Sequence, residues 1–443
     1  MAHEHSEVAR PSLSRRAAAT AALLCFAAAM VVGIWSLVDD PGTLLIVIPA
    51  FVITGLAVGS ALVNRGLRRL LGTAVAAVAL VVLVLALDVA GITTAIIVII
   101  LIAASGAATR TAFGRHRPSG VAVGPARHGV LIVNPRSGGG AAERHHLVDE
   151  ARQRGIATIT LTPGDDLRAL AEDAVAGGAD VIGMAGGDGS QALVADVARR
   201  HDVAFVCIPA GTRNHFAADL GLDRSDVAGA LEGFITAVER RIDLGEVDGR
   251  VFVNNASLGI YAEIVQSDDY RNSKIGTATE MLPDLLGPRA TPPDLRFTGP
   301  DGELTPTADV LLVSNNAYQL RSLGGLGTRP KLDGGELGVV TVLVDRAHDV
   351  PALMALESAG ALERFRGFHR WTTPTLRVDS TGPVNIGIDG EAMQLDPPLE
   401  FRCLPVALRV RVPPHAPGVP PTRPGMLGTL PALVRIVAGH SPR

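Results

Sequence analysis

The chain has 443 residues, of which 47% are hydrophobic, and a formal net charge of −4. That length allows two or three domains, and a slightly acidic chain lacks the basic field expected of a protein that binds nucleic acid. The three cysteines lie far apart and none has the spacing of a metal site, so no disulfide framework is expected. The composition fits a reducing compartment.

The hydrophobic excess is concentrated in about the first hundred residues. Four apolar segments, 17–38, 43–63, 71–87 and 90–108, each approach the roughly 20 residues that span a bilayer core. We therefore predict a bundle of four transmembrane helices within residues 17–108. A signal peptide is the alternative for the first segment, but three more such segments follow it without a clear cleavage site.

Charges that flank these segments predict their orientation. Basic residues lie before the first segment, between the second and third, and after the fourth, whereas the other two connections carry only acidic residues. The basic positions are Arg10, Arg15, Arg16, Arg65, Arg68, Arg69, Arg110, Arg115 and Arg117, and the acidic ones are Asp39, Asp40 and Asp88. Under the positive-inside rule both ends of the bundle face the cytoplasm. We predict a cytoplasmic N-terminus at 1–16 and a multi-pass protein of the cell membrane whose remaining chain is cytoplasmic.

After a linker at 109–127, apolar strands alternate with helical stretches over residues 128–241. Strands are expected at 129–133, 157–161, 181–185 and 203–208, and helices at 141–155, 166–176 and 191–200. This alternation predicts an α/β domain with a parallel sheet, whose ligand sites lie at the carboxyl ends of the strands.

Beyond residue 241 the pattern changes to short strands punctuated by turn residues. Strands are expected at 251–256, 309–314, 338–344, 375–379, 384–388, 399–404 and 406–412, with helices only near 270–286 and 350–366. We predict a second, mostly antiparallel β domain over 242–412, followed by a Pro/Gly-rich tail at 413–443.

Three turns that directly follow predicted strands combine glycine with Ser, Thr or Asn, at 134–140, 186–190 and 209–214. Glycine lets several backbone N–H groups approach a phosphate, and the dipole of a following helix adds to the attraction. Because such turns converge on one rim of a parallel sheet, they predict a nucleotide cleft. Asp188 would repel a phosphate there unless Mg²⁺ lies between them or unless the carboxylate handles a substrate hydroxyl.

Other nucleotide and hydrolase motifs fit less well. Residues Gly187 to Ala192 match the dinucleotide pattern G-x-G-x-x-A, but the next strand ends without the acidic residue that would hold a ribose. The chain contains no G-x-x-x-x-G-K-[ST] sequence and no G-x-S-x-G elbow after a strand.

As an ordered set, the three turns resemble the motifs of the diacylglycerol kinase catalytic domain family, which includes sphingosine and ceramide kinases and is related to NAD kinases. The similarity continues, in the order of the family, at Lys331-Leu-Asp333-Gly-Gly335 and Asp389-Gly390-Glu391, and it covers about 128–412. It implies an α/β nucleotide domain, a β-sandwich domain and an active site between them.

The resemblance also implies roles for individual residues. The ATP-binding positions it implies are Asn134, Pro135, Ser137, Gly138, Thr162, Gly186, Gly187, Asp188, Gly189, Ser190, Gln191, Ala192, Thr212 and Asn214. It implies a structural Mg²⁺ site at Asp333 with the backbone carbonyls of Pro330 and Gly335. Glu391 resembles the general base of the family, linked to Asp188 and Mg²⁺ through water.

Two residues depart from the family pattern: Arg213 replaces a small residue, and His215 stands where an Asp is common. They put the substrate or nucleotide preference in question more than the reaction type. Without the other motifs, residues 389–391 would be an ordinary acidic turn, and Asp333-Gly would be a hairpin turn.

The leading hypothesis is an ATP- and Mg²⁺-dependent kinase of diacylglycerol that gives phosphatidate, with bilayer lipid as substrate. A membrane anchor supports a substrate dissolved in the bilayer. The alternatives are a kinase of another lipid alcohol, such as a sphingoid base or a polyprenol, and a non-catalytic membrane nucleotide sensor. Whether the chain forms a homodimer stays open.

Overall fold

The computed structural model describes residues 11–39, 49, 53–54, 57, 67–86, 89–114, 119–259, 293–305, 307–318, 329, 331–344, 349, 352–353, 356, 362–419 and 426–440. The chain divides into two compact units. One comprises residues 1–116 and 420–443, and the other comprises residues 117–419.

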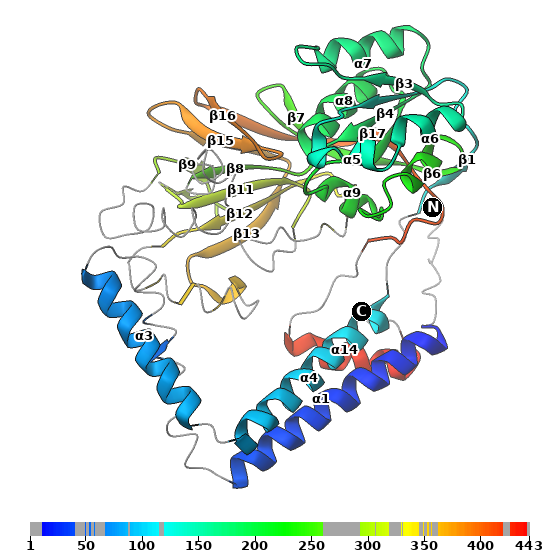
Figure 1. Ribbon diagram of the computed structural model, residues 1–443. Helices are drawn as coiled ribbons and strands as arrows, with labels where there is room; N and C mark the ends of the chain where they lie inside the picture. Colours follow the sequence, from blue (N-terminus) through cyan, green and yellow to red (C-terminus); the bar gives the residue numbers. More distant parts are fainter. Residues whose placement is uncertain are drawn as a thin grey trace, which may run out of the picture. The chain divides into compact units, whose positions relative to one another are not determined.

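The first unit contains apolar helices. Helix α1 (Leu13–Asp39) packs along α4 (Val89–Phe113), and the C-terminal helix α14 (Met426–Val437) packs against both (Figure 1). Two stretches, Leu13–Ser36 and Ile96–Phe113, are long and apolar enough to cross a membrane. These stretches confirm apolar helices at the first and fourth predicted segments, and α3 (Leu67–Ala86) corresponds to the third. The second segment lies almost wholly outside the described residues, so the four-helix bundle stays a prediction.

The second unit contains the parallel sheet that we predicted for residues 128–241. Strands β2 (Gly129–Val133), β3 (Ala157–Thr160), β4 (Val181–Gly186) and β5 (Ala204–Pro209) pair in the order β5-β4-β2-β3, all parallel. Buried apolar clusters cover both faces of this sheet, as expected for strands that are apolar along their whole length. The parallel α/β prediction is confirmed.

The helices of this part differ from the prediction at two places. The helix expected at 141–155 is two helices, α5 (Ala141–Arg144) and α6 (Leu147–Gln153), because His146 between them has a left-handed backbone with φ of 48°. Helix α8 spans Asp188–Arg200 and so begins three residues earlier than expected, since Gln191 already donates its N–H to the carbonyl of Gly187. Asp188 therefore lies in the first turn of a helix. Helix α7 (Leu167–Ala176) follows the prediction, and α9 (His215–Leu220) follows β5.

An antiparallel sheet of six strands confirms the predicted β domain. Its order is β13-β12-β11-β8-β15-β16. The strands are β8 (Asn255–Gly259), β11 (Val310–Asn315), β12 (Leu337–Val342), β13 (Phe368–Thr373), β15 (Val384–Ile388) and β16 (Glu391–Leu395). Its apolar face shares one buried cluster with strands that extend the first sheet, so the two layers form a sandwich (Figure 1).

The extension of the first sheet joins the two predicted domains. Strand β17 (Leu399–Val412) pairs parallel with β5, and antiparallel with β14 (Thr375–Asp379) and β6 (Ala237–Val247). Strand β6 also pairs with β1 (Val121–Val123) and β7 (Arg250–Phe252), and β14 pairs with β9 (Arg296–Thr298), which pairs with β10 (Leu304–Thr305). Strand β6 crosses residue 241, so one sheet runs through both parts.

The strand predictions near residue 405 and residue 253 were wrong in detail. Residues 399–412 form one strand with a bulge between Leu404 and Leu408, where Val406 has a left-handed φ of 44°. The strand expected at 251–256 is divided between β7 and β8. The helix expected near 270–286 lies outside the described residues. Near 350–366 the structure describes helical residues at 352–353 and 356 and a 3-10 turn at Leu362–Arg364.

Candidate active site

The three glycine-containing turns meet at the carboxyl ends of β2, β4 and β5. These strands are neighbours in the sheet, so the turns that follow them lie side by side. A Cβ atom added to Gly211 would lie 2.5 Å from the Cα of Gly187, and one added to Gly138 would lie 2.5 Å from the carbonyl oxygen of Ala210. The turns at 134–140, 186–190 and 209–214 therefore touch through their main chains, as the sequence predicted.

The first turn bends through three consecutive left-handed glycines. Residues 138, 139 and 140 have φ values of 57°, 66° and 84°, which residues other than glycine rarely adopt. Arg144 on α5 fixes the turn by donating hydrogen bonds to the carbonyls of Gly138, at 2.8 Å, and Gly139. Asn134 accepts a hydrogen bond from the backbone N–H of Arg136 at 3.1 Å. Carbonyls held in this way leave the N–H side of the turn available to an anion.

Asp188 connects the second turn to the third. Its two carboxylate oxygens accept hydrogen bonds from the backbone N–H groups of His215, at 3.0 Å, and Phe216, at 3.2 Å, which begin α9. Each oxygen keeps a further lone pair for another donor or a cation. Burial lowers the pKa of His215, so the imidazole is neutral near pH 7.

Asn214 organises the third turn from within. Its Oδ1 accepts the N–H of Gly211 at 2.8 Å, while its Nδ2 donates to the carbonyls of Pro209 at 3.0 Å and Gly211 at 2.8 Å. The residue has a left-handed φ of 52°, which Asn tolerates better than most side chains.

Gln191 and Ala192 lie inside the protein. The Nε2 of Gln191 donates to the carbonyls of Met184 and Ile208, both at 2.9 Å, and Gly186 at 3.3 Å. The side chain thus ties the ends of β4 and β5 together. Ala192 is buried against the core. Both residues were predicted as ATP-binding positions. Their described contacts are with the ends of β4 and β5 and with the core, on the inner side of the turns.

Glu391 comes from the other sheet. Asp389 and Gly390 form the tight turn of the β15–β16 hairpin with φ values of 48° and 86°, and Glu391 is the first residue of β16. A Cβ atom added to Gly189 would lie 2.7 Å from the Cδ of Glu391. The Glu391 carboxylate therefore lies against the first turn of α8, one residue from Asp188. Glu391 thus lies beside the residue that follows Asp188, the other residue predicted as catalytic.

Asp389 anchors this hairpin. Its carboxylate accepts backbone N–H groups from Val253 at 2.8 Å, Asn254 at 2.8 Å and Asn255 at 3.1 Å. Burial, assisted by the negative charge of Asp188, raises the pKa of Asp389 to about 7, although the three N–H donors oppose the shift. The sequence marked the motif but gave this residue no role.

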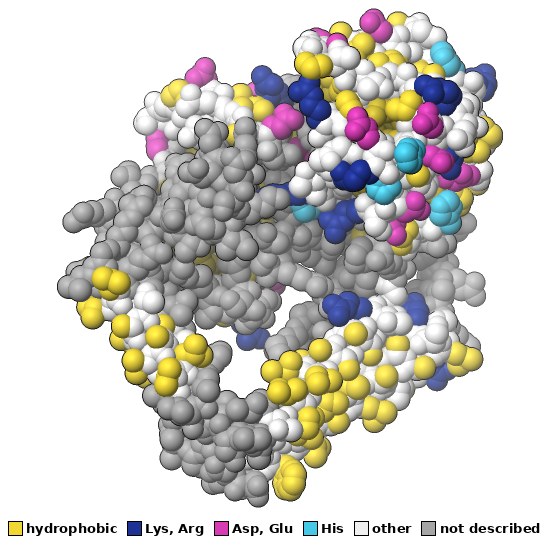
Figure 2. All heavy atoms as spheres, in the orientation of Figure 1, with side chains coloured by type: hydrophobic (Ala, Val, Ile, Leu, Met, Phe, Trp, Pro, Cys, Tyr) yellow, Lys and Arg dark blue, Asp and Glu magenta, His cyan; other side chains and the backbone are white. Residues whose placement is uncertain are grey.

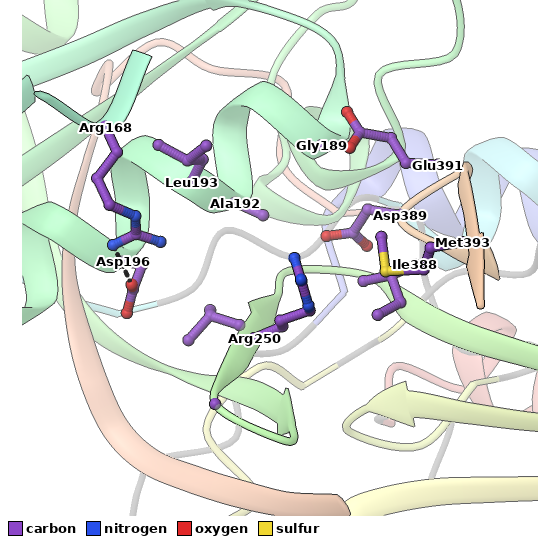
Figure 3. Close-up of a pocket in the computed structure, with 12 residues that line it drawn as sticks. Arg168, Gly189, Ala192, Leu193, Asp196, Arg250, Ile388, Asp389, Glu391 and Met393 are labelled. Carbon is purple, nitrogen blue, oxygen red and sulfur yellow. Dashed lines mark hydrogen bonds and ion pairs between the residues drawn. The ribbon is translucent and has the colours of Figure 1, made fainter. Parts of the chain in front are cut away.

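A cavity of about 130 Å³ adjoins Glu391. Helix α8, the turn before β7 and the β15–β16 hairpin line it. Figure 3 shows Arg250 directed toward Asp389, while Arg168 turns aside to pair with Asp196 at 2.8 Å. Leu193, Ile388 and Met393 complete an apolar part of the wall. The cavity combines a carboxylate, an arginine and apolar side chains.

The remaining predicted ATP-binding positions lie on or near the three turns, except Thr162, which follows a different strand. Thr162 follows the edge strand β3 and donates its N–H to Asp165 at 2.7 Å, and Thr212 is exposed in the third turn. Ser137 lies near Gly187, whose added Cβ would be 3.8 Å from its Oγ. Pro135, between Asn134 and Ser137, and Ser190 are both half-buried.

The predicted Mg²⁺ site is described only in part, because Pro330 lies outside the described residues. Asp333 is exposed, and the N–H of Gly335 donates to Asp243 at 2.6 Å. Within the described ranges no group of three or more His, Cys, Asp or Glu could hold a metal. One carboxylate and one carbonyl fit Mg²⁺ that keeps several waters. The Arg240 guanidinium interacts with the Asp333 charge and would weaken cation binding there.

Arg329 and Asp219 form a buried ion pair that the sequence did not suggest. Arg329 is fully buried; its Nη2 lies 2.7 Å from an Asp219 oxygen, and its guanidinium stacks 5.3 Å from the ring centre of Tyr318. It also donates to the carbonyls of Val253 and Asn315. The two residues are 110 positions apart in sequence, and the pair connects α9 to the bend before β8 and to β11. No local pattern marks such a contact.

A parallel sheet with three phosphate-type turns at its rim, joined to a β-sandwich that delivers a glutamate to that rim, defines a nucleotide-dependent phosphotransferase fold. The family model for the diacylglycerol kinase catalytic domain matches residues 128–247. A protein of Stenotrophomonas maltophilia (strain K279a) named "Probable lipid kinase YegS-like" is 32% identical over 313 residues, which cover 65% of this chain and 96% of that protein. The diacylglycerol kinase of Bacillus subtilis (strain 168) is 32% identical over 185 residues, which cover 38% of this chain and 59% of that protein.

The crystal structure of a candidate diacylglycerol kinase from Bacillus anthracis str. Sterne resembles this fold with a TM-score of 0.51 at 19% identity. The match covers 66% of this chain and 97% of that one. The chain belongs to the diacylglycerol kinase catalytic domain family. By that membership it is a kinase of the lipid-kinase type.

Proposed function

We propose that the protein is a membrane-anchored kinase that transfers the γ-phosphate of ATP to the hydroxyl of diacylglycerol and gives phosphatidate. The observation that carries this proposal is the position of the Glu391 carboxylate against Gly189, at the start of α8 and beside the three turns. A carboxylate from a second sheet at the rim of a phosphate-type cradle suits a group that receives a proton from an alcohol.

The three turns would bind the phosphates of ATP. Their main chains are in contact, and the first bends through three left-handed glycines, which suits N–H groups that converge on an anion. Asn214 and Gln191 would hold the turns in shape rather than touch the nucleotide, because their described hydrogen bonds go to backbone groups of the turns and of β4 and β5. Mg²⁺ would supply charge neutralisation of the phosphates when bound.

Glu391 would act as the general base. Its exposed side chain can accept the hydroxyl proton as the acceptor oxygen bonds to the γ-phosphorus and the bond to ADP breaks. General-base catalysis contributes typically about 10² to 10⁴ in rate, and in phosphoryl transfer most of the remainder comes from positioning and electrostatics. Asp188, which holds α9 in place, would orient the groups around the transferred phosphate.

The acceptor site would include the cavity beside Glu391. Its volume of about 130 Å³ would admit a small polar group that carries the hydroxyl. The apolar helices α1 and α4 support a location at the bilayer, where such a substrate is dissolved. The names of the relatives, a lipid kinase and a diacylglycerol kinase, point to the same class of acceptor.

The test is transfer of labelled γ-phosphate from ATP to diacylglycerol in mixed micelles. Wild type should label phosphatidate, and Glu391→Gln should reduce kcat by about 10² or more. Glu303→Gln is the matched control, because Glu303 is an exposed glutamate in the turn between β9 and β10 and should leave the rate unchanged.

A panel of lipid alcohols decides the acceptor. Label on a sphingoid base or a polyprenol, and none on diacylglycerol, would replace the proposed substrate. Equal rates for wild type and Glu391→Gln would remove the base. No labelled lipid from any acceptor would refute the function.

A further inference from the structure

The C-terminal helix α14 is part of the same unit as the N-terminal apolar helices, although about 300 residues of sequence separate it from α4. One face of α14 is buried against the beginning of α1 and the end of α4. The buried residues of this cluster are Ala19 and Ala22 of α1, Ala112 and Phe113 of α4, and Ala432, Leu433 and Ile436 of α14. Small alanines let the three helices approach closely, so α14 is an integral part of this unit.

Two consecutive arginines of α1 hold the ends of the other two helices. Arg15 donates to the carbonyls of Ala112 and Phe113 at the end of α4, both at 2.8 Å. Arg16 donates to the carbonyl of Val437 at the end of α14, at 3.0 Å. A cation at a helix C-terminus satisfies free carbonyls and is favoured by the helix dipole. The position of α14 is therefore specified by polar contacts as well as by packing.

The outward face of α14 is apolar and basic. Leu430 is 39% exposed and Val434 is 56% exposed, with Arg435 exposed beside them. Apolar side chains of α1 and α4 are also exposed along these helices, and Figure 2 shows them as many yellow side chains among white atoms. Arg16 and Arg110 lie at the same end of the helices as α14. Apolar side chains flanked by cations suit the headgroup region of a bilayer with anionic lipids.

We propose that α14 is an interfacial membrane helix, so that the unit of residues 117–419, which we call the catalytic unit, is joined to the bilayer at both of its ends. This inference rests on the membrane location in the proposed function. Residues 13–36 and 96–113 are long enough to cross a membrane, and α14 packs on the ends of those helices that carry the arginines. Two attachments hold a catalytic unit at the surface more firmly than one, because release of either end leaves the other in place.

Proteolysis of the full chain tests the second attachment separately from the first. A protease site is inserted after residue 118, and the protein is reconstituted into vesicles of phosphatidylcholine and phosphatidylglycerol. The uncut chain must sediment with the vesicles; if it stays in the supernatant, the membrane location in the proposed function is wrong, and this inference fails with it. After cleavage, the fragment from residue 119 to 443 should still sediment with the vesicles.

The matched control carries a second protease site between residues 420 and 425. Cutting both sites should release the fragment from 119 to the second site, because that fragment lacks α14. Release of the 119–443 fragment to the same extent would overturn the inference, since α14 would then provide no attachment. Kinase activity measured on soluble substrate analogue in both fractions reports whether the released fragment is folded.

Three aspartate substitutions in the singly cut protein distinguish lipid contact from protein contact. Ile436→Asp, at a fully buried position of α14, should release most of the fragment. Val434→Asp, on the outward face, should weaken vesicle binding about 10-fold or more, because a charge is placed in the lipid-facing surface. Val121→Asp, 70% exposed in the catalytic unit, should have no effect. If Val434→Asp behaves like Val121→Asp, α14 binds only the other helices, and the interfacial proposal is refuted.

Discussion

The buried pair of Arg329 and Asp219 should be the most sensitive position outside the proposed catalytic groups. Arg329→Met removes the guanidinium and leaves the Asp219 carboxylate, 3% exposed, without its partner. Breaking a buried pair in this way costs about 3–5 kcal/mol. The carbonyl of Asn315 also loses a donor, which costs about 1–3 kcal/mol if water does not replace it. We expect a loss of about 5 kcal/mol or more, against a total stability of about 5–15 kcal/mol for a typical domain.

Asp219→Asn measures the contribution of the Asp219 charge separately from its shape. Asparagine keeps the shape and the acceptor for the Arg329 backbone N–H, which lies 3.1 Å from Asp219 Oδ1, but removes the negative charge that balances the guanidinium. We expect a loss of about 3–5 kcal/mol. The double variant Asp219→Asn with Arg329→Met removes both charges, so its loss should be smaller than the sum of the two single losses by about 2–3 kcal/mol.

The assay is urea unfolding of the detergent-solubilised chain, followed by the emission of Trp371, which stacks on Phe297 in the β-sandwich. Arg377→Met is the matched control, because Arg377 pairs with Asp379 in solvent with both side chains more than 40% exposed, and such pairs contribute about 0–1 kcal/mol. If Arg329→Met destabilises the protein no more than Arg377→Met does, the pair does not support the fold as we infer.

Two further predictions concern the contact between the sheets. Gly189→Ala should lower kcat by about 10², because the new Cβ displaces the Glu391 carboxylate. The free energy of unfolding should change by less than about 1 kcal/mol, since Glu391 is exposed and alanine favours a helix. An unchanged kcat would contradict the contact between Gly189 and Glu391. Asp389→Asn should flatten the pH dependence of stability. With a pKa of about 7 in the folded protein, Asp389 keeps a proton that the unfolded chain loses above about pH 4. The protonated carboxyl therefore contributes stability that is fully present below about pH 4 and is lost as the pH rises to about 7. The loss is at most about 4 kcal/mol. Urea unfolding at pH 5 and pH 8 measures this difference, and parallel losses in wild type and variant would show that Asp389 is ionised throughout.

The parts of the fold that depend on local chemistry could be predicted from the sequence. Strands β2, β4 and β5 are short apolar runs that end in glycine turns, and a parallel sheet places such ends at one rim whatever the rest of the chain does. The early start of α8 escaped prediction because glycine and aspartate are poor helix formers. Here Gly187 adopts an extended backbone before the helix, with ψ of 172°, which allows Asp188 to begin it.

Contacts over long sequence distances could not be predicted from periodicity. Only the family resemblance placed Glu391 near Asp188, since 203 residues separate them. The pair of Arg329 and Asp219 follows no motif, and a lone arginine in a stretch of Gly, Thr and Pro is usually interpreted as a surface residue. The continuity of β17 was hidden by Pro405, because a proline is typical of a strand end. Here Pro405 lies in a bulge of the strand, and the next residue, Val406, donates its N–H to Asp243 at 2.7 Å.

The buried pair has a consequence for catalysis because of what lies at its two ends. On one side Asp219 belongs to α9, whose first N–H groups bind Asp188. On the other side Arg329 holds the carbonyl of Val253 and the side chain of Asn254. The pair thus lies between the second phosphate-type turn and the segment 253–255, where β7 passes into β8.

The segment 253–255 holds the hairpin that carries the proposed base. The N–H groups of residues 253–255 bind Asp389, and Glu391, two residues later, returns to Gly189 beside Asp188. The contacts form a closed ring, so a shift of α9 relative to the sandwich would change the distance between base and phosphate. Because displacement of a reacting group by about 1 Å can cost about 10² in rate, Asp219→Asn should lower kcat more than it raises the KM for ATP. Equal changes in both would mean that the pair supports the fold without positioning Glu391.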